Sequence, residues 1–385
     1  MATEQQSIPA GRASRITALA GAGAKVGVNY LRHYGKRAVG AQVDSEELDE
    51  ANAGAIYDTF SKLKGGPLKF AQMLSIDRNI LPEAYRKQFA QAQYSAPPLS
   101  YPLVVRTFKR EFGREPLAIF DTFTQSAMHG ASIGQVHRAT IGNQRFAVKV
   151  QYPGVADSLD SDLAVVKPVA LQILGLKSGE VGPYFQEVRE RLLEETNYTL
   201  ELERSIALSE ATADQIKGIR FPRYYSEYSN RRVLTMDWID GQPLDRYAAD
   251  EADQDRRNAV AQAIWDFYHF QIHHLKQFHA DPHPGNFLVD DEGQVVVLDF
   301  GCTKQIGDDF HRDYFRFLDP EVVEDEAAFI EALETLEIIS PDDLPRDREL
   351  IIESAKRGTQ LLGKPFHEGS FDFADESYME SICEM

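Results

Sequence analysis

Helix-like and strand-like segments fall into separate blocks along this chain, and their order limits the folds that it can adopt. From 45 to 117 the apolar residues recur mainly at helical spacing. Between 118 and 150 short segments rich in Ile, Phe and Val take over, broken by glycines and by a turn at 141–144. Long helical patterns return at 183–210 and 253–276. Because helices and strands do not alternate as in βαβ units, we predict an α+β fold with a small antiparallel sheet.

The elements inside these blocks can be bounded more closely. In the first block we predict helices over 45–64, 68–80, 83–93 and 103–112. Ser45 fits the N-cap of the first, while Pro82 and Pro102 precede the last two. Further strands are predicted over 231–238, 287–289 and 295–298, the last two joined by Asp-Asp-Glu-Gly as a hairpin.

The net charge of the chain limits the kinds of ligand that it can bind. The net charge is -19, from sixty acidic and forty-one basic residues, which argues against a nucleic-acid ligand. Residues 1–40 differ, with six bases and one acid, so the remainder carries -24. That contrast permits peripheral contact with an anionic membrane surface. A loose, solvated basic leader explains the same composition equally well.

Cysteine usage and hydropathy bear on the compartment. Two cysteines, Cys302 and Cys383, cannot build a disulfide framework and fit a reducing environment. No apolar run reaches the roughly eighteen residues of a membrane span, and no secretory signal is evident. Residues 10–38 are Arg-containing, Ala-rich and free of acids, as in mitochondrial presequences. We expect an intracellular, cytoplasmic protein with peripheral membrane association, or a mitochondrial one in a eukaryote.

Two carboxylates and an amide follow one another around the predicted hairpin. Asn286 lies five residues after Asp281, and Asp299 opens Asp-Phe-Gly thirteen residues after Asn286. Phosphoryl transfer needs oxygen ligands for magnesium and a carboxylate beside the attacking group. Asp-Phe-Gly alone arises by chance, but the complete spacing is typical of the kinase signature set. We predict that Asn286 and Asp299 hold magnesium and that Asp281 positions the nucleophile.

A lysine on a predicted strand supplies the complementary charge. Lys149, within Ala-Val-Lys-Val, resembles the residue that binds nucleotide phosphates in kinases. Fifteen residues earlier stands Gly134, and small residues around it would let backbone N–H groups approach phosphate oxygens. Without the later motifs, Lys149 would be interpreted as a solubilising surface charge.

Three segments together resemble the AarF or UbiB family of atypical kinases, over about residues 60 to 370. They are Ala-Ser-Ile-Gly-Gln-Val-His at 131–137, Ala-Val-Lys-Val-Gln-Tyr-Pro-Gly-Val at 147–155 and His-Ala-Asp-Pro-His-Pro-Gly-Asn at 279–286. The resemblance implies a protein-kinase-like two-lobed fold with an N-terminal helical extension. It also implies ATP and magnesium as ligands and a link to ubiquinone synthesis.

Two family motifs appear here in altered form. Lys-x-Gly-Gln reads Lys69-Phe70-Ala71-Gln72, and Glu-x-Asp reads Glu195-Thr196-Asn197. The resemblance implies that Lys69 and Gln72 reach into the active site and contact Glu195, where protein kinases admit a peptide. We expect the Ala71 methyl group to shift its helix slightly. The amide of Asn197 is expected to weaken any ionic or metal-binding role there.

Glu201 is the expected ion-pair partner of Lys149, with an exposed helix charge as the alternative. The residues predicted to contact the nucleotide are Ala131, Ser132, Gly134, Gln135, Lys149, Glu195, Glu201 and Met236. Ala280 replaces the arginine of the kinase His-Arg-Asp motif, and only the short stretch 302–308 precedes the next helical pattern. We therefore expect no peptide-docking platform.

These features divide the chain into four parts. They are a basic N-terminal segment over 1–44, a helical extension over 45–117, a kinase-like N-lobe with inserted helices over 118–239 and a C-lobe over 240–385. The last part is short for a kinase-like C-lobe, so we expect a few closing helices to lie beyond residue 385.

The leading hypothesis is a magnesium-dependent ATPase or small-molecule kinase that supports isoprenoid quinone synthesis. Its ligands would be ATP and ADP, with a small-molecule or lipid-like acceptor. A nucleotide-sensing scaffold without useful turnover is an alternative, motivated by Ala71 and Asn197. A metal hydrolase using His279, Asp281 and His283, with nearby His273 and His274, is a third. That hypothesis leaves Lys149 and Asp-Phe-Gly unexplained.

Overall fold

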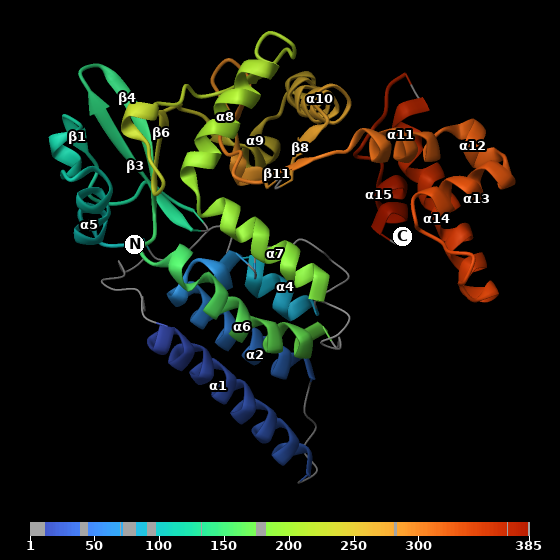
Figure 1. Cartoon of the computed structure of the whole chain (residues 1–385), viewed down its shortest axis with the longest axis horizontal. Helices are drawn as coiled ribbons and strands as arrows, with labels where there is room; N and C mark the ends of the chain where they lie inside the picture. Colours follow the sequence, from blue (N-terminus) through green and yellow to red (C-terminus); the bar gives the residue numbers. More distant parts are fainter. Residues whose placement is uncertain are drawn as a thin grey trace. The chain divides into compact units, whose positions relative to one another are not determined.

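The structure, a computed structural model, consists of two compact units (Figure 1). It describes residues 12–38, 45–69, 71, 82–90, 98–131, 133–174, 182–280, 283–367 and 369–383. Unit 1 contains Met1–Phe267 and His279–Thr303, and unit 2 contains Tyr268–Phe278 and Lys304–Met385. Helices and sheets are both present, so the predicted α+β class is confirmed.

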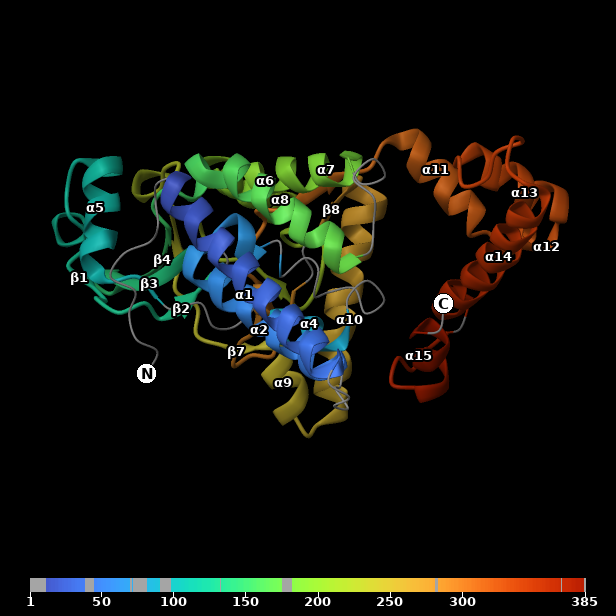
Figure 2. The same cartoon turned by 90° about the horizontal axis from the view of Figure 1, so that it is seen from below.

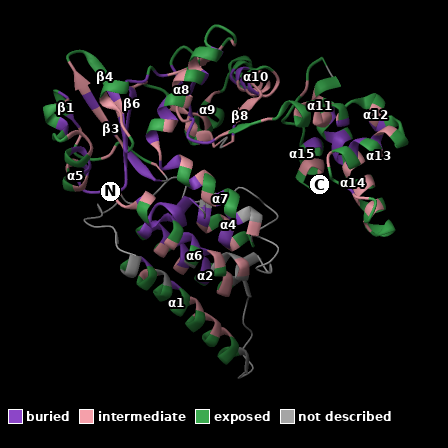
Figure 3. Cartoon of the chain, in the orientation of Figure 1, coloured by how far each residue is buried: buried purple, intermediate pink, exposed green. Residues whose placement is uncertain are grey.

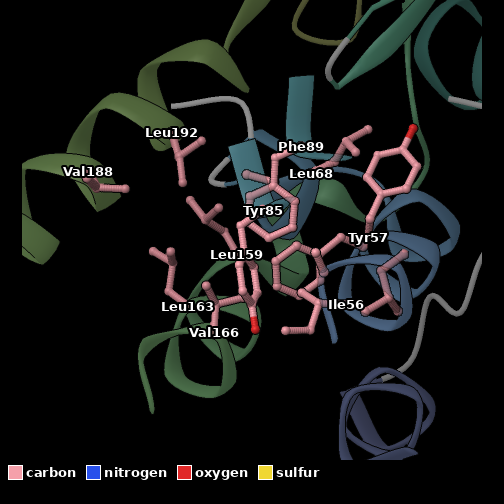
Figure 4. Packing of buried hydrophobic residues seen from close by; sticks show 14 of the residues in the cluster. Ile56, Tyr57, Leu68, Tyr85, Phe89, Leu159, Leu163, Val166, Val188 and Leu192 are labelled. Atoms are coloured by element: carbon pink, nitrogen blue, oxygen red, sulfur yellow. The ribbon is translucent and has the colours of Figure 1, made fainter. Parts of the chain in front are cut away.

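A layer of helices forms one part of unit 1 (Figures 1 and 2). It comprises α1 (Arg12–Ala38), α2 (Ser45–Leu63), α4 (Glu83–Ala90), α6 (Val155–Leu174) and α7 (Gly182–Glu195). Helix α2 packs on α1 and α4, and α6 packs on α1 and α7. Their apolar faces meet in one buried cluster, whose members include Ile56, Leu68, Phe89, Leu159 and Leu192 (Figure 4).

The basic N-terminal segment is not a loose leader over its described part. Residues 12–38 form helix α1, and Arg15 near its start is only 1% exposed. Its guanidinium forms a buried ion pair with Asp162 of α6. The alternative of a loose, solvated leader is therefore wrong for these residues, and no motif around Arg15 indicates its burial from sequence. Most of α1 is nevertheless exposed, including Lys25, Arg32 and Lys36 (Figure 3).

The first sheet of unit 1 is antiparallel, as predicted. It contains β1 (Thr122–Phe123), β2 (His129–Gly130), β3 (Gly134–Ile141), β4 (Gln144–Gln151) and β6 (Val233–Asp237). The order is β1-β3-β4-β6, with β2 also on β3. Helix α5 (Tyr101–Phe112), predicted as part of the helical extension, packs instead on β4. Its buried Val104 and Phe108 join Phe146 in the core of this sheet.

The second sheet contains the predicted hairpin. Strands β9 (Phe287–Val289) and β10 (Val295–Val297) pair antiparallel, with β5 (Ile219–Arg220) and β7 (Gln242–Pro243) at the edges in the order β5-β10-β9-β7. Helix α9 (Leu244–Asp250) follows β7. Helix α10 (Gln254–Phe270) ends before the predicted residue 276, because residues 271–275 form a wider π-helical turn.

The helix predicted over 183–210 is two helices. Helix α7 ends at Glu195, and α8 (Tyr198–Thr212) begins after Thr196 and Asn197. At the break, the Tyr198 N–H donates to the Arg231 carbonyl at 3.1 Å rather than to a carbonyl of its own helix. The Gln151 side chain donates to the Thr196 carbonyl at 2.8 Å. The adjacent sheet segment thus satisfies the groups that an uninterrupted helix would have paired internally.

Unit 2 is mainly helical. It contains α11 (Asp308–Phe317), α12 (Pro320–Glu324), α13 (Glu326–Thr335), α14 (Pro345–His367) and α15 (Glu376–Cys383). Phe317, Phe329 and Leu333 form its apolar core. Strands β8 (Gln277–His279) and β11 (Thr303–Gln305) pair with each other. The predicted lobe boundary at 239–240 stays a prediction. Among the described residues, no helix combines the length and apolarity needed to span a bilayer.

Candidate nucleotide site

Lys149 lies in the middle of the first sheet and is buried. It is on β4, opposite Val136 of β3 and Leu234 of β6, and is 7% exposed. Its Nζ atom is 2.7 Å from Glu201 Oε1 and 2.9 Å from Asp299 Oδ2. The alternative of a solubilising surface lysine is therefore wrong. Three segments distant in sequence converge on this one ammonium group.

Glu201 is in the first turn of α8, and its predicted pairing with Lys149 is confirmed. The side chain is 2% exposed. Burial and the neighbouring Asp299 charge raise the pKa of Glu201 to about 7, although Lys149 acts in the opposite direction. The alternative of an exposed helix charge is excluded.

Asp299 follows β10 and faces the same lysine. Burial alone would raise its pKa, but Lys149 and the Gly301 N–H hold that pKa well below the ordinary range, so the group is ionised. The Gly301 N–H donates to Oδ1 at 2.7 Å. The His279 ring contacts the Asp299 carbonyl at 2.5 Å and fixes the backbone. With 31% of its side chain exposed, Asp299 is the most accessible of the three charged groups.

Asn286 ends the short helix Pro284–Asn286 directly before β9. Its carbonyl accepts the Leu298 N–H at 2.9 Å, so the hairpin holds it beside the residue preceding Asp299. A carboxylate and an amide are the oxygen donors that magnesium prefers. The local charge fits a cation too, because the carboxylates of Glu195, Glu201 and Asp299 outnumber the ammonium groups of Lys69 and Lys149. Asp281 lies outside the described residues.

Lys69 is close to Glu195, as predicted. Its Nζ atom is 3.1 Å from Glu195 Oε1, and both side chains are 10% exposed. Glu195 also contributes to the raised pKa of Glu201, which places it within electrostatic reach of the Lys149 cluster. The Ala71 methyl group packs in the apolar cluster of the helical layer. Gln72 lies outside the described residues.

Gly134 is required because its neighbours leave no room for a side chain, which is a different reason from the predicted approach of backbone N–H groups to phosphate oxygens. A Cβ atom there would lie 2.6 Å from the Tyr198 hydroxyl and 2.7 Å from the Val150 carbonyl oxygen. Tyr198 in turn lies under Lys149, with its ring centre 5.0 Å from Nζ. Sequence reasoning missed Tyr198, which follows the helix break directly.

The other predicted nucleotide contacts lie around this sheet. The Ala131 N–H donates to the Gly134 carbonyl at 2.9 Å, and Ser132 lies outside the described residues. The Gln135 side chain is buried and accepts the Leu99 N–H at 2.7 Å, which gives it a structural task. Met236 is 6% exposed on β6, in the apolar cluster that contains Tyr198. Their contact with a nucleotide stays a prediction.

The histidines do not assemble a metal site within the described part of the chain. His279 is held by the Asp299 carbonyl, and His283 accepts the Gly285 N–H at 3.0 Å. His273 and His274 belong to unit 2. No group of three or more described His, Cys, Asp or Glu residues has an arrangement suited to a metal ion. The hydrolase hypothesis therefore has no support from these residues.

A family profile and individual relatives all indicate the same family of atypical kinases. The profile of the ABC1 atypical kinase-like domain matches residues 91–333. The protein named atypical kinase COQ8B, mitochondrial, from Danio rerio is 28% identical, covering 98% of this chain and 62% of its own length. Atypical kinase COQ8, mitochondrial, from Saccharomyces cerevisiae is 27% identical, with 98% and 76% covered.

A solved structure is also similar. Rv3197 from Mycobacterium tuberculosis, determined in complex with erythromycin, has a TM-score of 0.60 and 25% identity, covering 87% of this chain and 84% of its own. Curated relatives from zebrafish, fission yeast and Dictyostelium discoideum are longer, since the chain spans 60% to 66% of their lengths.

Proposed function

Because the chain belongs to the ABC1 atypical kinase-like family, we propose that it binds ATP with magnesium and transfers or hydrolyses the terminal phosphoryl group. The observation that carries this proposal is the contact of Lys149 with both Glu201 and Asp299. In kinases, the corresponding lysine-glutamate pair and metal-binding aspartate must both be in place for phosphoryl transfer. The link to ubiquinone synthesis rests on the family and on the relatives named COQ8.

Each charged group has a distinct task in this proposal. Glu201 holds the Lys149 ammonium group toward the α- and β-phosphates. Asp299 and Asn286 would hold magnesium, which when bound neutralises charge on the phosphate oxygens. Asp281 would position the attacking hydroxyl group or water.

The acceptor is proposed to be small or lipid-like rather than a protein. Lys69 and Glu195 place part of the helical layer near the Lys149 cluster. The family resemblance implies that these residues occupy the space where protein kinases admit a peptide. The segment from Gly301 to α11 is short, because α11 begins at Asp308. The exposed Lys25, Arg32 and Lys36 of α1 support peripheral contact with an anionic membrane. Relatives named as mitochondrial support that compartment for a eukaryotic source.

The proposal is tested with Asp299→Asn in the full chain. ATP binding in magnesium should weaken at least about a hundredfold, since a hard anionic ligand is lost from a partly exposed side chain. Phosphate release should fall with it. Asp291→Asn, in the exposed hairpin turn, is the matched control. Unchanged affinity for magnesium-ATP would refute the assignment. If the chain binds nucleotide but shows no phosphate release that depends on Asp299, the alternative of a nucleotide-sensing scaffold is favoured.

A further inference from the structure

A second concave site in unit 1 has a different chemistry. It is a cavity of about 200 Å³ between α5, the turn that precedes α6, and the residue before β6. The lining residues include Arg106, Arg110 and Arg232, together with Pro153, Gly154 and Asp157. Three arginines at one cavity are unusual in a chain of net charge -19. The nucleotide proposal uses none of these residues.

Arg232 is the buried member of this group. Its side chain is 9% exposed, and the nearest carboxylate oxygens are Glu111 Oε1 at 3.5 Å and Asp157 Oδ2 at 3.7 Å. Both distances exceed the 2.7–3.2 Å range of N–H···O hydrogen bonds. Within the described residues, its guanidinium group donates no hydrogen bond that meets this geometry. The Arg232 guanidinium, held only by these two longer ion pairs, keeps N–H donors for a further acceptor in the cavity.

The other walls favour an anion as that acceptor. Arg106 and Arg110 are one helical turn apart on α5 and are exposed. The N-terminus of α6 lies at the cavity, because Gly154 and Asp157 flank its first residue, Val155. Two carboxylates oppose this charge. Glu111 lies 4.0 Å from Arg110, and the Asp157 side chain is 67% exposed. Three guanidinium groups against two carboxylates leave the site positive.

We propose that this cavity binds a phosphate group, either as a free phosphate compound or as a lipid headgroup. Guanidinium groups match phosphate oxygens in a bidentate geometry, and a helix N-terminus adds backbone donors. The volume suits a single headgroup, since pockets for larger ligands typically exceed about 300 Å³. A phosphate here completes the hydrogen bonding of Arg232.

The test is calorimetric titration of inorganic phosphate into the full chain at constant ionic strength, with sodium chloride as the reference salt. The wild type should bind phosphate, and Arg106→Gln and Arg110→Gln should each weaken binding about tenfold. Both side chains are exposed, so these variants should fold. Arg114→Gln, also exposed and just beyond α5, is the matched control and should bind normally. Lys149→Ala should retain this binding, which separates the cavity from the nucleotide site.

Sedimentation with phosphatidylcholine vesicles, with and without phosphatidic acid, distinguishes the sources. If the wild type binds vesicles that contain phosphatidic acid and both arginine variants do not, the ligand is a lipid headgroup. If vesicle binding is the same in the wild type and the variants, or is absent in all of them, the ligand is a free phosphate compound. No phosphate binding by the wild type, or equal binding by all variants, would overturn the proposal. Arg232 would then serve only to bridge Glu111 and Asp157.

Discussion

Unit 1 contains two buried charge clusters that differ in how completely they are satisfied. In the helical layer, Arg15 Nε and Nη2 lie 2.7 Å and 2.6 Å from the two Asp162 carboxylate oxygens. Arg15 also donates to the Leu63 carbonyl at 2.9 Å, and Ser158 donates to Asp162 at 3.0 Å. The two charges balance, and their side chains are 2% and 1% exposed.

At the sheet, one lysine faces two carboxylates, and one of these, Asp299, remains 31% exposed. A closed, neutral pair fixes the position of helices, whereas an open cluster with excess negative charge can accept a cation and its ligand. Burial of charged side chains alone therefore does not indicate function. The informative features of the sheet cluster are its excess of negative charge and the exposure of the Asp299 side chain to solvent.

The largest expected effect comes from breaking the closed pair. Arg15→Met leaves the Asp162 carboxylate buried without its cation, and should reduce the free energy of unfolding by about 3–5 kcal/mol. Urea unfolding of the full chain measures it. The double variant Arg15→Met/Asp162→Leu should recover most of the loss, because apolar side chains can replace a buried pair. A single variant of wild-type stability would show that the contact is incidental.

Breaking the open cluster should affect ligand binding instead. Lys149→Ala should weaken ATP binding about a hundredfold through the phosphates and leave adenosine binding unchanged. Fluorescence titration with both ligands measures the difference. Lys217→Ala, at an exposed position, is the control. An equal loss for ATP and adenosine would make Lys149 a structural residue.

The pH dependence of stability sharpens the contrast further. The pKa of Glu201 is raised from its usual 4.5 to about 7, so the folded state binds more protons than the unfolded state between these values. Its contribution to stability is complete below pH 4.5 and is lost as the pH rises to about 7. Glu201→Gln should flatten this decline, on the order of 2 kcal/mol, in urea unfolding across the window. An unchanged slope would contradict the assignment.

A smaller effect is expected where the helical layer meets the cluster. Lys69→Ala should change turnover or nucleotide preference about tenfold, because it leaves Glu195 without its cation beside Glu201. Steady-state phosphate release with ATP, GTP and ADP competition measures this. Lys62→Ala on the exposed face of α2 should behave as the wild type. Identical kinetics of both variants would restrict Lys69 to a packing role.

The smallest effect belongs to a surface counterpart of Arg15. Arg189 Nε of α7 lies 2.6 Å from Asp160 Oδ1 of α6, the helix that also contains Asp162, with side chains 38% and 68% exposed. Solvent and salt screen such a pair. Arg189→Gln should therefore unfold at the wild-type urea concentration. A loss comparable to that of Arg15→Met would mean that burial is not what distinguishes the two pairs.

The sheet cluster was largely predictable, and the helical pair was not. Lys149 and Asp299 stand at fixed positions in strand patterns, so their convergence follows from the motif order. Arg15 and Asp162 are 147 positions apart and belong to no motif, so neither periodicity nor composition links them.

The helix break was missed for a related reason. Residues 183–210 keep a helical pattern, but the Tyr198 N–H takes its partner from Arg231 in another element. A tertiary hydrogen bond of this kind leaves no trace in local propensity. The requirement for Gly134 was predicted from phosphate approach, whereas the structure adds a close neighbour, the Tyr198 hydroxyl, that only the folded chain reveals.

The Arg15–Asp162 pair also bears on where the folding unit begins. The family profile starts at residue 91, yet Arg15 and Lys69 precede it and are buried against Asp162 and Glu195 inside it. A fragment that begins at the profile boundary would expose the apolar faces of α6 and α7. It would also leave Asp162 and Glu195 without their basic partners. The folding unit of the helical layer thus includes helices that precede the residues matched by the family profile, and the relatives named COQ8B and COQ8 also align with these preceding residues.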